Sequence, residues 1–224
     1  MDVDLSLRKL FSLHNFGIKL GLDNTLNFLN YLGNPQNGLN TIHIAGSNGK
    51  GSTASFVASI LQEFGFKTGL YTSPHFIKFN ERVQKNGVQI SDDYIAEFVT
   101  EYEDYIDQHG LTFFEVTTAL AFKYFFEKGT DYCIIETGLG GRLDSTNVIS
   151  PEVIGITSLS VDHQLQLGET IDSIAMEKAG VLKPGVPAIT VQQDPAAMQV
   201  LKLQASNIKA PLSVTGGDID FSHR

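Results

Sequence analysis

The sequence predicts an α/β protein built in three layers, with a mainly parallel sheet flanked by helices. Two observations support this fold class. Short apolar segments of strand length alternate along the chain with longer segments whose apolar residues recur at helical spacing. Glycine or proline stands at many of the junctions between them, as is typical of turns. A chain of 224 residues can hold one large domain, or one domain and the start of another.

The first third of the chain predicts a helix followed by a strand–helix–strand unit. Leucines at near-helical spacing indicate one helix in residues 1–40, capped by Asp23. Ile42 and Ile44 then alternate in a short buried strand, a helix covers residues 53–64, and a second strand covers 68–72. A right-handed crossover would make the two strands parallel. The expected apolar face of the second helix comprises Phe56, Val57, Ile60, Leu61 and Phe64.

The middle of the chain predicts a hairpin and two helices. Pro74 lacks an N–H and should end the second strand. Residues 82–90 contain two strand-like segments around a glycine-containing loop, which indicates a small hairpin. Ser91 then caps a helix that runs to about His109.

Thr112 and Glu115 have the spacing of a capping box in front of a strongly apolar helix that ends near Gly129. We prefer this interpretation of Glu115 over a catalytic role. Phe113 and Phe114 are interpreted as core residues, although their position beside a loop leaves a ligand-binding role open.

The rest of the chain predicts three further strands, at residues 131–137, 153–157 and 187–191. The first of them leads into a second glycine-rich loop, residues 138–147. A helix capped by Thr170 should end at Gly180, acting as a left-handed C-cap. Asp194 caps another helix, and no closing element is expected after Val214, so the sheet is expected to be unfinished.

Bulk composition excludes several classes of function. A formal net charge of −9 argues against general binding to nucleic acid or to a membrane surface, both of which require basic surfaces. The chain begins with no signal-peptide pattern and has no apolar run of membrane-spanning length. The single cysteine, Cys133, cannot form an internal disulfide. We therefore expect a cytoplasmic protein.

The segment 41–52, TIHIAGSNGKGS, has the layout of a phosphate-binding loop between a strand and a helix. Gly46, Gly49 and Gly51 would let backbone N–H groups converge on phosphate oxygens at a helix N-terminus. Lys50 would neutralise the outer phosphates, and Ser52 would hold a magnesium ion. The alternative is an ordinary glycine turn, which three glycines around a lysine and a serine make a weaker interpretation. The fold is thus expected to be of the P-loop NTPase type.

The spacing of this loop departs from the common Walker pattern, in which more residues precede the Gly-Lys pair. Only Ser47 and Asn48 separate Gly46 from Gly49, and Gly51 stands where serine or threonine usually follows the lysine.

Further polar residues fall at or just beyond expected strand ends, and parallel strands would bring them to the edge that carries the loop. Ser73, Glu136 and His163 follow strands, and Lys178 lies one helix later. Glu136 ends an apolar strand, so its carboxylate should be paired or bound to a metal. His163 and Lys178 each have a structural alternative: His163 as a hydrogen-bonded core histidine, Lys178 as a cation at a helix C-terminus.

Four motifs together resemble the folylpolyglutamate synthase/dihydrofolate synthase family of the Mur ligase group. In chain order they are HIAGSNGKGST, YTSPHFIKFNERVQKNG, ETGLGGRLDSTNVI and SVDHQLQLGETIDSIAMEKAGVLKPGVPAI. The resemblance runs from about residue 16 to residue 189, and the unusual glycine spacing is this family's form. It implies the central, ATP-binding domain of a Mur ligase over residues 1–224, incomplete and without the family's C-terminal domain.

The resemblance implies an ATP-dependent amide ligase. Such an enzyme adds L-glutamate to a reduced folate, and bifunctional members also use dihydropteroate, through an acyl-phosphate intermediate. The partners would be small molecules only, and we expect a monomer. Two alternatives stay open: a phosphotransferase that uses the same loop, and a truncated remnant that binds nucleotide without catalysis.

The resemblance also assigns residues to sites. It implies two magnesium ions, the first held by Ser52, Ser73 and Glu136 and the second by His163, and a carbamylated Lys178 supporting the second. Lys50, His163 and Lys178 would be catalytic. The nucleotide would contact Asn48, Gly49, Lys50, Gly51, Ser52 and Asn147, and the folate would contact Ser73, Pro74, His75 and Arg82.

Overall fold

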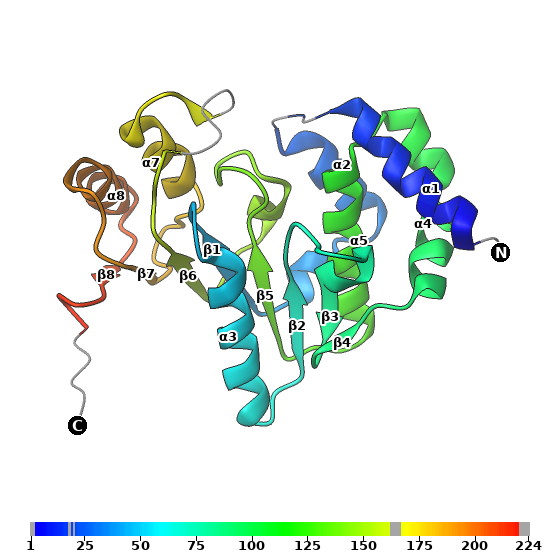
Figure 1. Cartoon of the computed structure of the whole chain (residues 1–224), viewed down its shortest axis with the longest axis horizontal. Helices are drawn as coiled ribbons and strands as arrows, with labels where there is room; N and C mark the ends of the chain where they lie inside the picture. Colours follow the sequence, from blue (N-terminus) through cyan, green and yellow to red (C-terminus); the bar gives the residue numbers. More distant parts are fainter. Residues whose placement is uncertain (1–2, 18, 20, 162–166, 220–224) are drawn as a thin grey trace.

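The computed structural model describes residues 3–17, 19, 21–161 and 167–219. Within these residues one sheet of eight strands has the order β4-β3-β2-β5-β1-β6-β7-β8 (Figure 1). All pairs are parallel except β2–β3 and β3–β4. The strands are β1 Thr41–Ala45, β2 Thr68–Tyr71, β3 Val83–Lys85, β4 Val88–Gln89, β5 Tyr132–Glu136, β6 Val153–Ile156, β7 Ala188–Thr190 and β8 Leu212–Val214.

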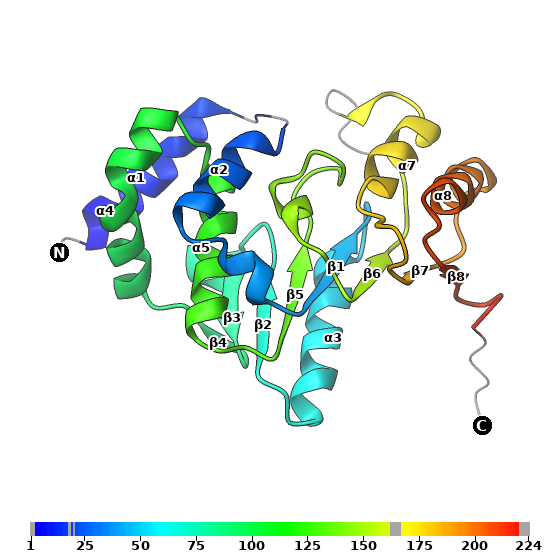
Figure 2. The same ribbon diagram turned by 180° about the vertical axis from the view of Figure 1, so that it is seen from behind.

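Helices cover both faces of the sheet unequally, which confirms the α/β class with a mainly parallel sheet (Figures 1 and 2). Helix α3 packs on one face, and α5, α7 and α8 pack on the other, with α1, α2 and α4 beyond α5. The α-helices are α1 Val3–Ser12, α2 Asp23–Tyr31, α3 Lys50–Glu63, α4 Asp92–His109, α5 Phe113–Glu127, α7 Ile171–Ala179 and α8 Pro195–Ile208. Four short 3₁₀ helices are η1 Leu13–Phe16, η2 Pro35–Gly38, η3 Phe79–Arg82 and η4 Ser145–Val148.

Strand β1 shows how the alternation of side chains builds these layers. Ile42 and Ile44 point toward α3 and join its core cluster. Ala45 packs on the opposite face against the α7–α8 cluster, and His43 bonds to η4 on that same face. Because β1, β2 and β5 are parallel, their carboxyl ends meet at one edge of the sheet, which is where ligands bind in such folds.

Four predicted N-caps, at Ser91, Thr112, Thr170 and Asp194, are confirmed. The hydroxyls of Ser91 and Thr170 accept backbone N–H groups at the starts of α4 and α7, and the Asp194 carboxylate does so at the start of α8. Thr112 and Glu115 form a complete capping box, in which the Glu115 carboxylate accepts the Thr112 N–H at 2.7 Å. The preferred reading of Glu115 is therefore confirmed.

Two expectations about the first part of the chain were wrong. Helix α1 precedes the single helix expected there, and it is held by packing against α4 and α5. Asp23 is the first residue of α2 and makes no side-chain cap. Helix α3 begins at Lys50, three residues before the expected segment 53–64, because the glycine loop leads directly into it. Strands β1 and β2 are parallel as expected, and β5, whose Ile134 and Ile135 are fully buried, lies between them.

The apolar face of α3 is only partly buried, contrary to expectation. Val57 and Leu61 pack toward the sheet, whereas Phe56, Ile60 and Phe64 are 69%, 56% and 76% exposed. Helical spacing alone gives one broad apolar stripe, and here the sheet contacts only one flank of it.

Gly180 does not adopt the predicted left-handed conformation. Its φ and ψ of −64° and −8° are right-handed. A Cβ on Gly180 would lie 2.7 Å from Cα of Arg142, so the glycine is required by the close approach of another segment. The same holds for Gly141, whose Cβ would lie 2.9 Å from the Glu177 carbonyl oxygen.

Strand β8, which the sequence did not predict, adds to the sheet at its edge. Within the described residues only a turn over residues 215–219 follows it, and this turn folds back on the strand. The Asp218 carboxylate accepts the Val214 N–H at 2.9 Å, and the Val214 carbonyl oxygen accepts N–H groups from Gly217, Asp218 and Ile219. In the described part of the chain, no helix is both long and apolar enough to cross a membrane.

Candidate active site at the phosphate loop

The loop after β1 is braced by the segment that follows β6. The backbone N–H groups of Ser47 and Asn48 both donate to the Ser158 carbonyl oxygen, and the Ser47 hydroxyl donates to the Ser160 carbonyl oxygen at 3.0 Å. Gly46 has φ of 145°, and a side chain there would collide with Thr157. The loop shape is therefore fixed by neighbouring backbone as well as by its own glycines.

Gly49 ends the loop in a left-handed conformation, with φ of 84°, and Lys50 then opens α3. This geometry turns the N-terminus of a 14-residue helix toward the loop. The Lys50 ammonium donates to the Ser47 carbonyl oxygen at 3.3 Å, so it folds back over the loop. Ser52 lies exposed in the first turn of the helix.

The end of β5 places a buried carboxylate beside this helix turn. Glu136 is 4% exposed, and its Oε2 accepts the Ser73 N–H at 2.9 Å. A Cβ on Gly51 would lie 3.5 Å from the same oxygen. Burial raises the pKa of Glu136, while the Ser73 N–H and the charges of Lys50 and Arg82 oppose the rise. The structure thus brings the ends of β1, β2 and β5 together as expected.

Lys178 lies beneath the phosphate loop. It is 2% exposed, and its ammonium donates to the Gly46 carbonyl oxygen at 2.9 Å. The second glycine-rich loop packs on the end of the helix that carries it: the Arg142 N–H donates to the Glu177 carbonyl oxygen, and the Arg142 guanidinium bonds to the Glu177 carboxylate at 2.8 Å. Gly141 of this loop therefore permits the close packing that positions Lys178.

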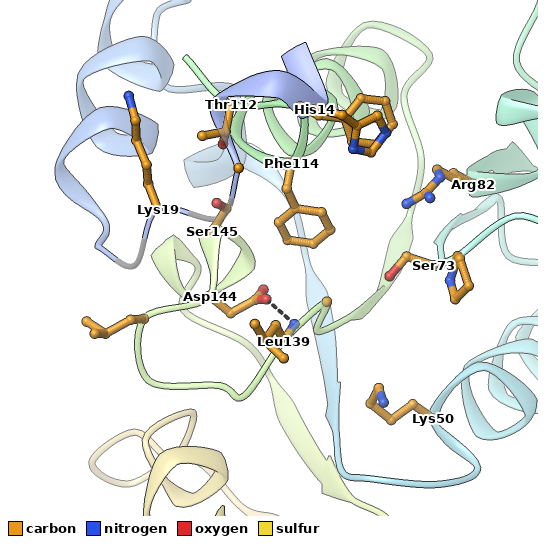
Figure 3. Close-up of a pocket in the computed structure, with 15 residues that line it drawn as sticks. His14, Lys19, Lys50, Ser73, Arg82, Thr112, Phe114, Leu139, Asp144 and Ser145 are labelled. Atoms are coloured by element: carbon orange, nitrogen blue, oxygen red, sulfur yellow. Dashed lines mark hydrogen bonds between the residues drawn. The ribbon is translucent and has the colours of Figure 1, made fainter. Parts of the chain in front are cut away.

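A cavity of about 430 Å³ lies at the same edge of the sheet (Figure 3). Figure 3 shows Arg82 and Ser73 on one side, Asp144 and Ser145 on the other, and the Phe114 ring between them. Its lining residues come from the N-terminal segment, the phosphate loop, the loop after β2, the start of α5 and the loop after β5. They are His14, Gly17, Lys19, Lys50, Ser73, Pro74, Arg82, Thr112, Phe113, Phe114, Gly138, Leu139, Leu143, Asp144 and Ser145.

Aromatic rings and one guanidinium form a wall of this cavity. The Phe113 ring stacks on His14 with centroids 3.9 Å apart, and the Arg82 guanidinium lies 5.2 Å from the Phe113 centroid. Arg82 is 7% exposed and donates from Nε to Nδ1 of His75 at 2.8 Å. Burial and the charge of Arg82 lower the pKa values of both histidines, which favours their neutral forms. The Ser73–Pro74 peptide beside them is cis.

The loop after β2 is held by a single carboxylate. Glu81 accepts the backbone N–H groups of Phe76, Ile77 and Lys78 at 2.7 to 2.9 Å. These bonds lower the pKa of Glu81. They also fix Phe76 and Ile77 with 96% and 85% of their surfaces exposed, just beyond Pro74 at the cavity.

Two predicted site residues stand apart from this arrangement. The Asn147 amide nitrogen donates to the carbonyl oxygens of Arg142 and Gly180, so it ties the second loop to the end of α7. Its buried Oδ1 has no hydrogen-bond partner among the residues described. His163 lies outside the described residues.

Sequence reasoning missed several residues of the cavity wall. His14, Lys19 and Asp144 were not singled out, and Phe113 and Phe114 were interpreted as core residues. Phe113 is buried, which confirms the core interpretation, and it also lines the cavity, so its ligand-binding role stays a prediction. Asp144 could have been predicted as a site residue because it lies in the second glycine-rich loop. The sequence around His14 contains no comparable signal.

Comparison with known proteins agrees with this geometry. Residues 44–218 match the family described as the Mur ligase middle domain. The dihydrofolate synthase/folylpolyglutamate synthase of Bacillus subtilis is 44% identical over 203 residues, which cover 88% of this chain and 47% of the relative. The chain thus spans about half the length of that relative.

Solved structures give the same result. The folylpolyglutamate synthase of Mycobacterium tuberculosis, complexed with ADP and AMPPCP, superposes with a TM-score of 0.88 at 32% identity, over 96% of this chain and 51% of that one. An FPGS–AMPPCP–folate complex gives a TM-score of 0.89 at 35% identity, over 97% and 55%. The resemblance found in the sequence motifs is confirmed, and the chain belongs to the Mur ligase family, whose middle domain it carries.

Proposed function

We propose that this chain forms the ATP-binding and folate-binding part of a ligase that joins L-glutamate to a reduced folate, with dihydropteroate as a second candidate acceptor. One observation carries the proposal: a cavity with an aromatic wall opens directly onto the lysine of a phosphate loop (Figure 3). The names of the relatives, and the AMPPCP and folate held by solved neighbours, support it.

The proposed nucleotide site consists of the loop and the first turn of α3. Backbone N–H groups from Gly49 to Gly51 would cradle the phosphates at the helix N-terminus, beside Asn48. Lys50 would leave the Ser47 carbonyl oxygen and bond to the outer phosphates. The adenosine triphosphate is a substrate, consumed in each turnover.

The residues at the loop suit a magnesium ion. Glu136 supplies a buried carboxylate whose raised pKa reflects an unfavourable desolvated charge. No cluster of three or more His, Cys, Asp or Glu side chains occurs within the described ranges. Ser52, Ser73, phosphate oxygens and water would therefore complete a site of oxygen ligands, as magnesium prefers. The ion would offset the negative charge where two anions meet.

The cavity would hold the folate with its ring system against Phe113 and its carboxylate toward Lys50. Ser73, Pro74 and Arg82 line this cavity, and His75, which accepts a hydrogen bond from Arg82, is proposed with them as a folate contact. The substrate carboxylate would attack the γ-phosphorus, giving an acyl phosphate and ADP. The neutral glutamate amine would then add to the carbonyl carbon, and the tetrahedral intermediate would expel phosphate as the nitrogen loses one proton and keeps the other as the amide N–H. Arg82 would stabilise the negative charge of these steps.

We also propose individual roles for Lys178, His163 and Asn147. A carbamate on Lys178 would replace an ammonium by an anion beneath the loop and support a second magnesium ion together with His163. A mass increase of one carbamate on Lys178 would test this modification. Asn147 is proposed as a nucleotide contact through its free Oδ1.

The test is a product assay with ATP, magnesium, L-glutamate and tetrahydrofolate, repeated with dihydropteroate. The proposal predicts ADP release that requires both glutamate and acceptor, and a product enlarged by one glutamyl residue. Lys50→Ala should abolish ADP release and weaken AMPPCP binding. Lys67→Ala, an exposed lysine beyond the far end of α3, is the matched control.

Other outcomes would identify the two alternatives. ADP formation without glutamate, with phosphate on a stable product, would indicate a phosphotransferase. Binding of AMPPCP by calorimetry without ATP hydrolysis would indicate a nucleotide-binding remnant.

A further inference from the structure

The central strand carries a buried histidine that the proposed chemistry does not use. His43 lies on β1, is fully buried, and has Nε2 2.9 Å from Oγ1 of Thr146. Burial, aided by the charge of Lys183, lowers the pKa of His43 to about 3. The imidazole is therefore neutral at neutral pH and carries one N–H.

The hydrogen bonds around Thr146 determine which nitrogen carries that proton. The Thr146 hydroxyl donates its only proton to Oδ1 of Asp144. Nε2 of His43 must then be the donor to Thr146, which leaves Nδ1 as an acceptor. In the described part of the molecule Nδ1 has no hydrogen-bond partner. A buried polar atom without a partner is unfavourable, so packing alone does not account for a histidine here.

The chain of hydrogen bonds ends at the cavity wall. Asp144 lines the cavity and is itself 4% exposed (Figure 3). Its Oδ2 accepts the Leu139 N–H at 2.7 Å, and its Oδ1 accepts the Thr146 N–H at 3.0 Å. The carboxylate therefore fastens two stretches of one loop, and each stretch supplies lining residues, Leu139 in one and Ser145 in the other.

We propose that His43 is a positioning residue for acceptor binding: through Thr146 and Asp144 it sets the wall of the cavity relative to the phosphate loop. His43 lies within β1, which is paired on both sides, and Gly46 follows the last residue of that strand directly. One rigid strand thus carries the phosphate loop at its end and holds the acceptor wall from its middle. Correct spacing between the acceptor carboxylate and the γ-phosphate is worth large factors in rate. This inference rests on the proposed function.

The decisive variant is Thr146→Val, which removes the hydroxyl and both of its side-chain hydrogen bonds with little change in volume. Thr146→Ser keeps the hydroxyl and is the matched control. Calorimetric dissociation constants for tetrahydrofolate and for AMPPCP are measured on the same samples. We expect Thr146→Val to weaken tetrahydrofolate binding by about 10- to 100-fold, with AMPPCP binding unchanged, and Thr146→Ser to restore it.

Two results would overturn the inference while the proposed function stands: equal tetrahydrofolate affinity in wild type and Thr146→Val, or a parallel loss of both ligands that Thr146→Ser does not restore. If the wild-type chain binds AMPPCP but no tetrahydrofolate, the proposed function fails and the inference with it. If Thr146→Val does not fold, a measurement on the wild-type chain still tests the hydrogen-bond chain. Nitrogen-15 NMR of His43 should show the Nε2–H tautomer, and an Nδ1–H tautomer would refute the hydrogen-bond chain.

Discussion

Replacing Gly180 by alanine tests whether the end of α7 is set by close packing or by backbone conformation. The helical φ of Gly180 suits alanine, and in a helix this exchange alone is worth about 1 kcal/mol of stability. The new Cβ, however, would lie 2.3 Å from Cβ and 2.7 Å from Cα of Arg142, which would have to move by about 1.1 Å to restore an ordinary contact of 3.4 Å. Arg142 is held to Glu177 by backbone and side-chain bonds of 2.8 Å, so it cannot move freely.

Overpacking costs about 1–3 kcal/mol, and a 2.3 Å contact with a held neighbour belongs to the upper part of that range, so the steric loss should exceed the helical gain. We expect Gly180→Ala to lower the free energy of unfolding by about 1–2 kcal/mol, and the melting temperature by about 2–8 °C for a chain of this size. Urea titration followed by circular dichroism measures the first quantity, and a thermal scan measures the second.

Two further variants separate the two explanations. Gly217→Ala is the matched control, because its Cβ would meet nothing nearer than 3.6 Å, and its stability should change by less than about 0.5 kcal/mol. Asparagine tolerates a left-handed backbone but is larger than alanine, so Gly180→Asn should be less stable than Gly180→Ala. An alanine variant as stable as wild type, or an asparagine variant more stable than the alanine one, would refute the packing argument.

Three other predictions concern buried polar groups. The pKa of His43 is about 3 in the folded state and 6.5 in the unfolded state, so the free energy of unfolding falls as pH drops below 6.5, by on the order of 3 kcal/mol at pH 4. Urea titrations at pH 7 and pH 4 should show that His43→Gln lacks this part of the loss, and an equal loss in the variant and the wild type would contradict it. Burial raises the pKa of Glu136, so ionisation of its carboxyl group lowers the stability of the fold as pH rises above 4.5. At pH 8 without magnesium, Glu136→Gln should therefore unfold at a higher temperature than wild type, and a lower melting temperature would count against this. The same variant should lose the magnesium dependence of AMPPCP binding. Thr112→Val breaks the capping box and should cost about 1–2 kcal/mol, whereas Thr112→Ser should be near neutral in the same thermal scan.

Much of the fold followed from local signals in the sequence. Caps such as Ser91 and Thr112 are determined by residues a few positions apart, so their bonds could be predicted from spacing. The phosphate loop was found for the same reason. Contacts between distant segments could not be predicted in this way. The insertion of β5 between β1 and β2, and the docking of α1 on α4, depend on tertiary packing that leaves no periodic signal.

The candidate site also contains both residues that local sequence rules predict and residues that depend on contacts between distant segments. Lys50, Ser73 and Glu136 stand at strand ends, and the rule that such ends share an edge was enough to bring them together. His14 reaches the cavity only because η1 folds against the start of α5, and Gly180 is fixed by an approach from Arg142, 38 positions earlier in the chain. Neither contact has a counterpart in the spacing of residues.

The turn after β8 has a consequence for association between molecules. Exposed strand edges can pair with the edges of other chains and so nucleate aggregates. On β8 the N–H and carbonyl oxygen of Val214 are already occupied by the turn, with Asp218 supplying a carboxylate in place of a neighbouring strand. At the opposite border, β4 comprises only two residues. Both borders of the sheet therefore give an incoming strand little to pair with, and Asp218→Ala would expose the Val214 N–H to such pairing.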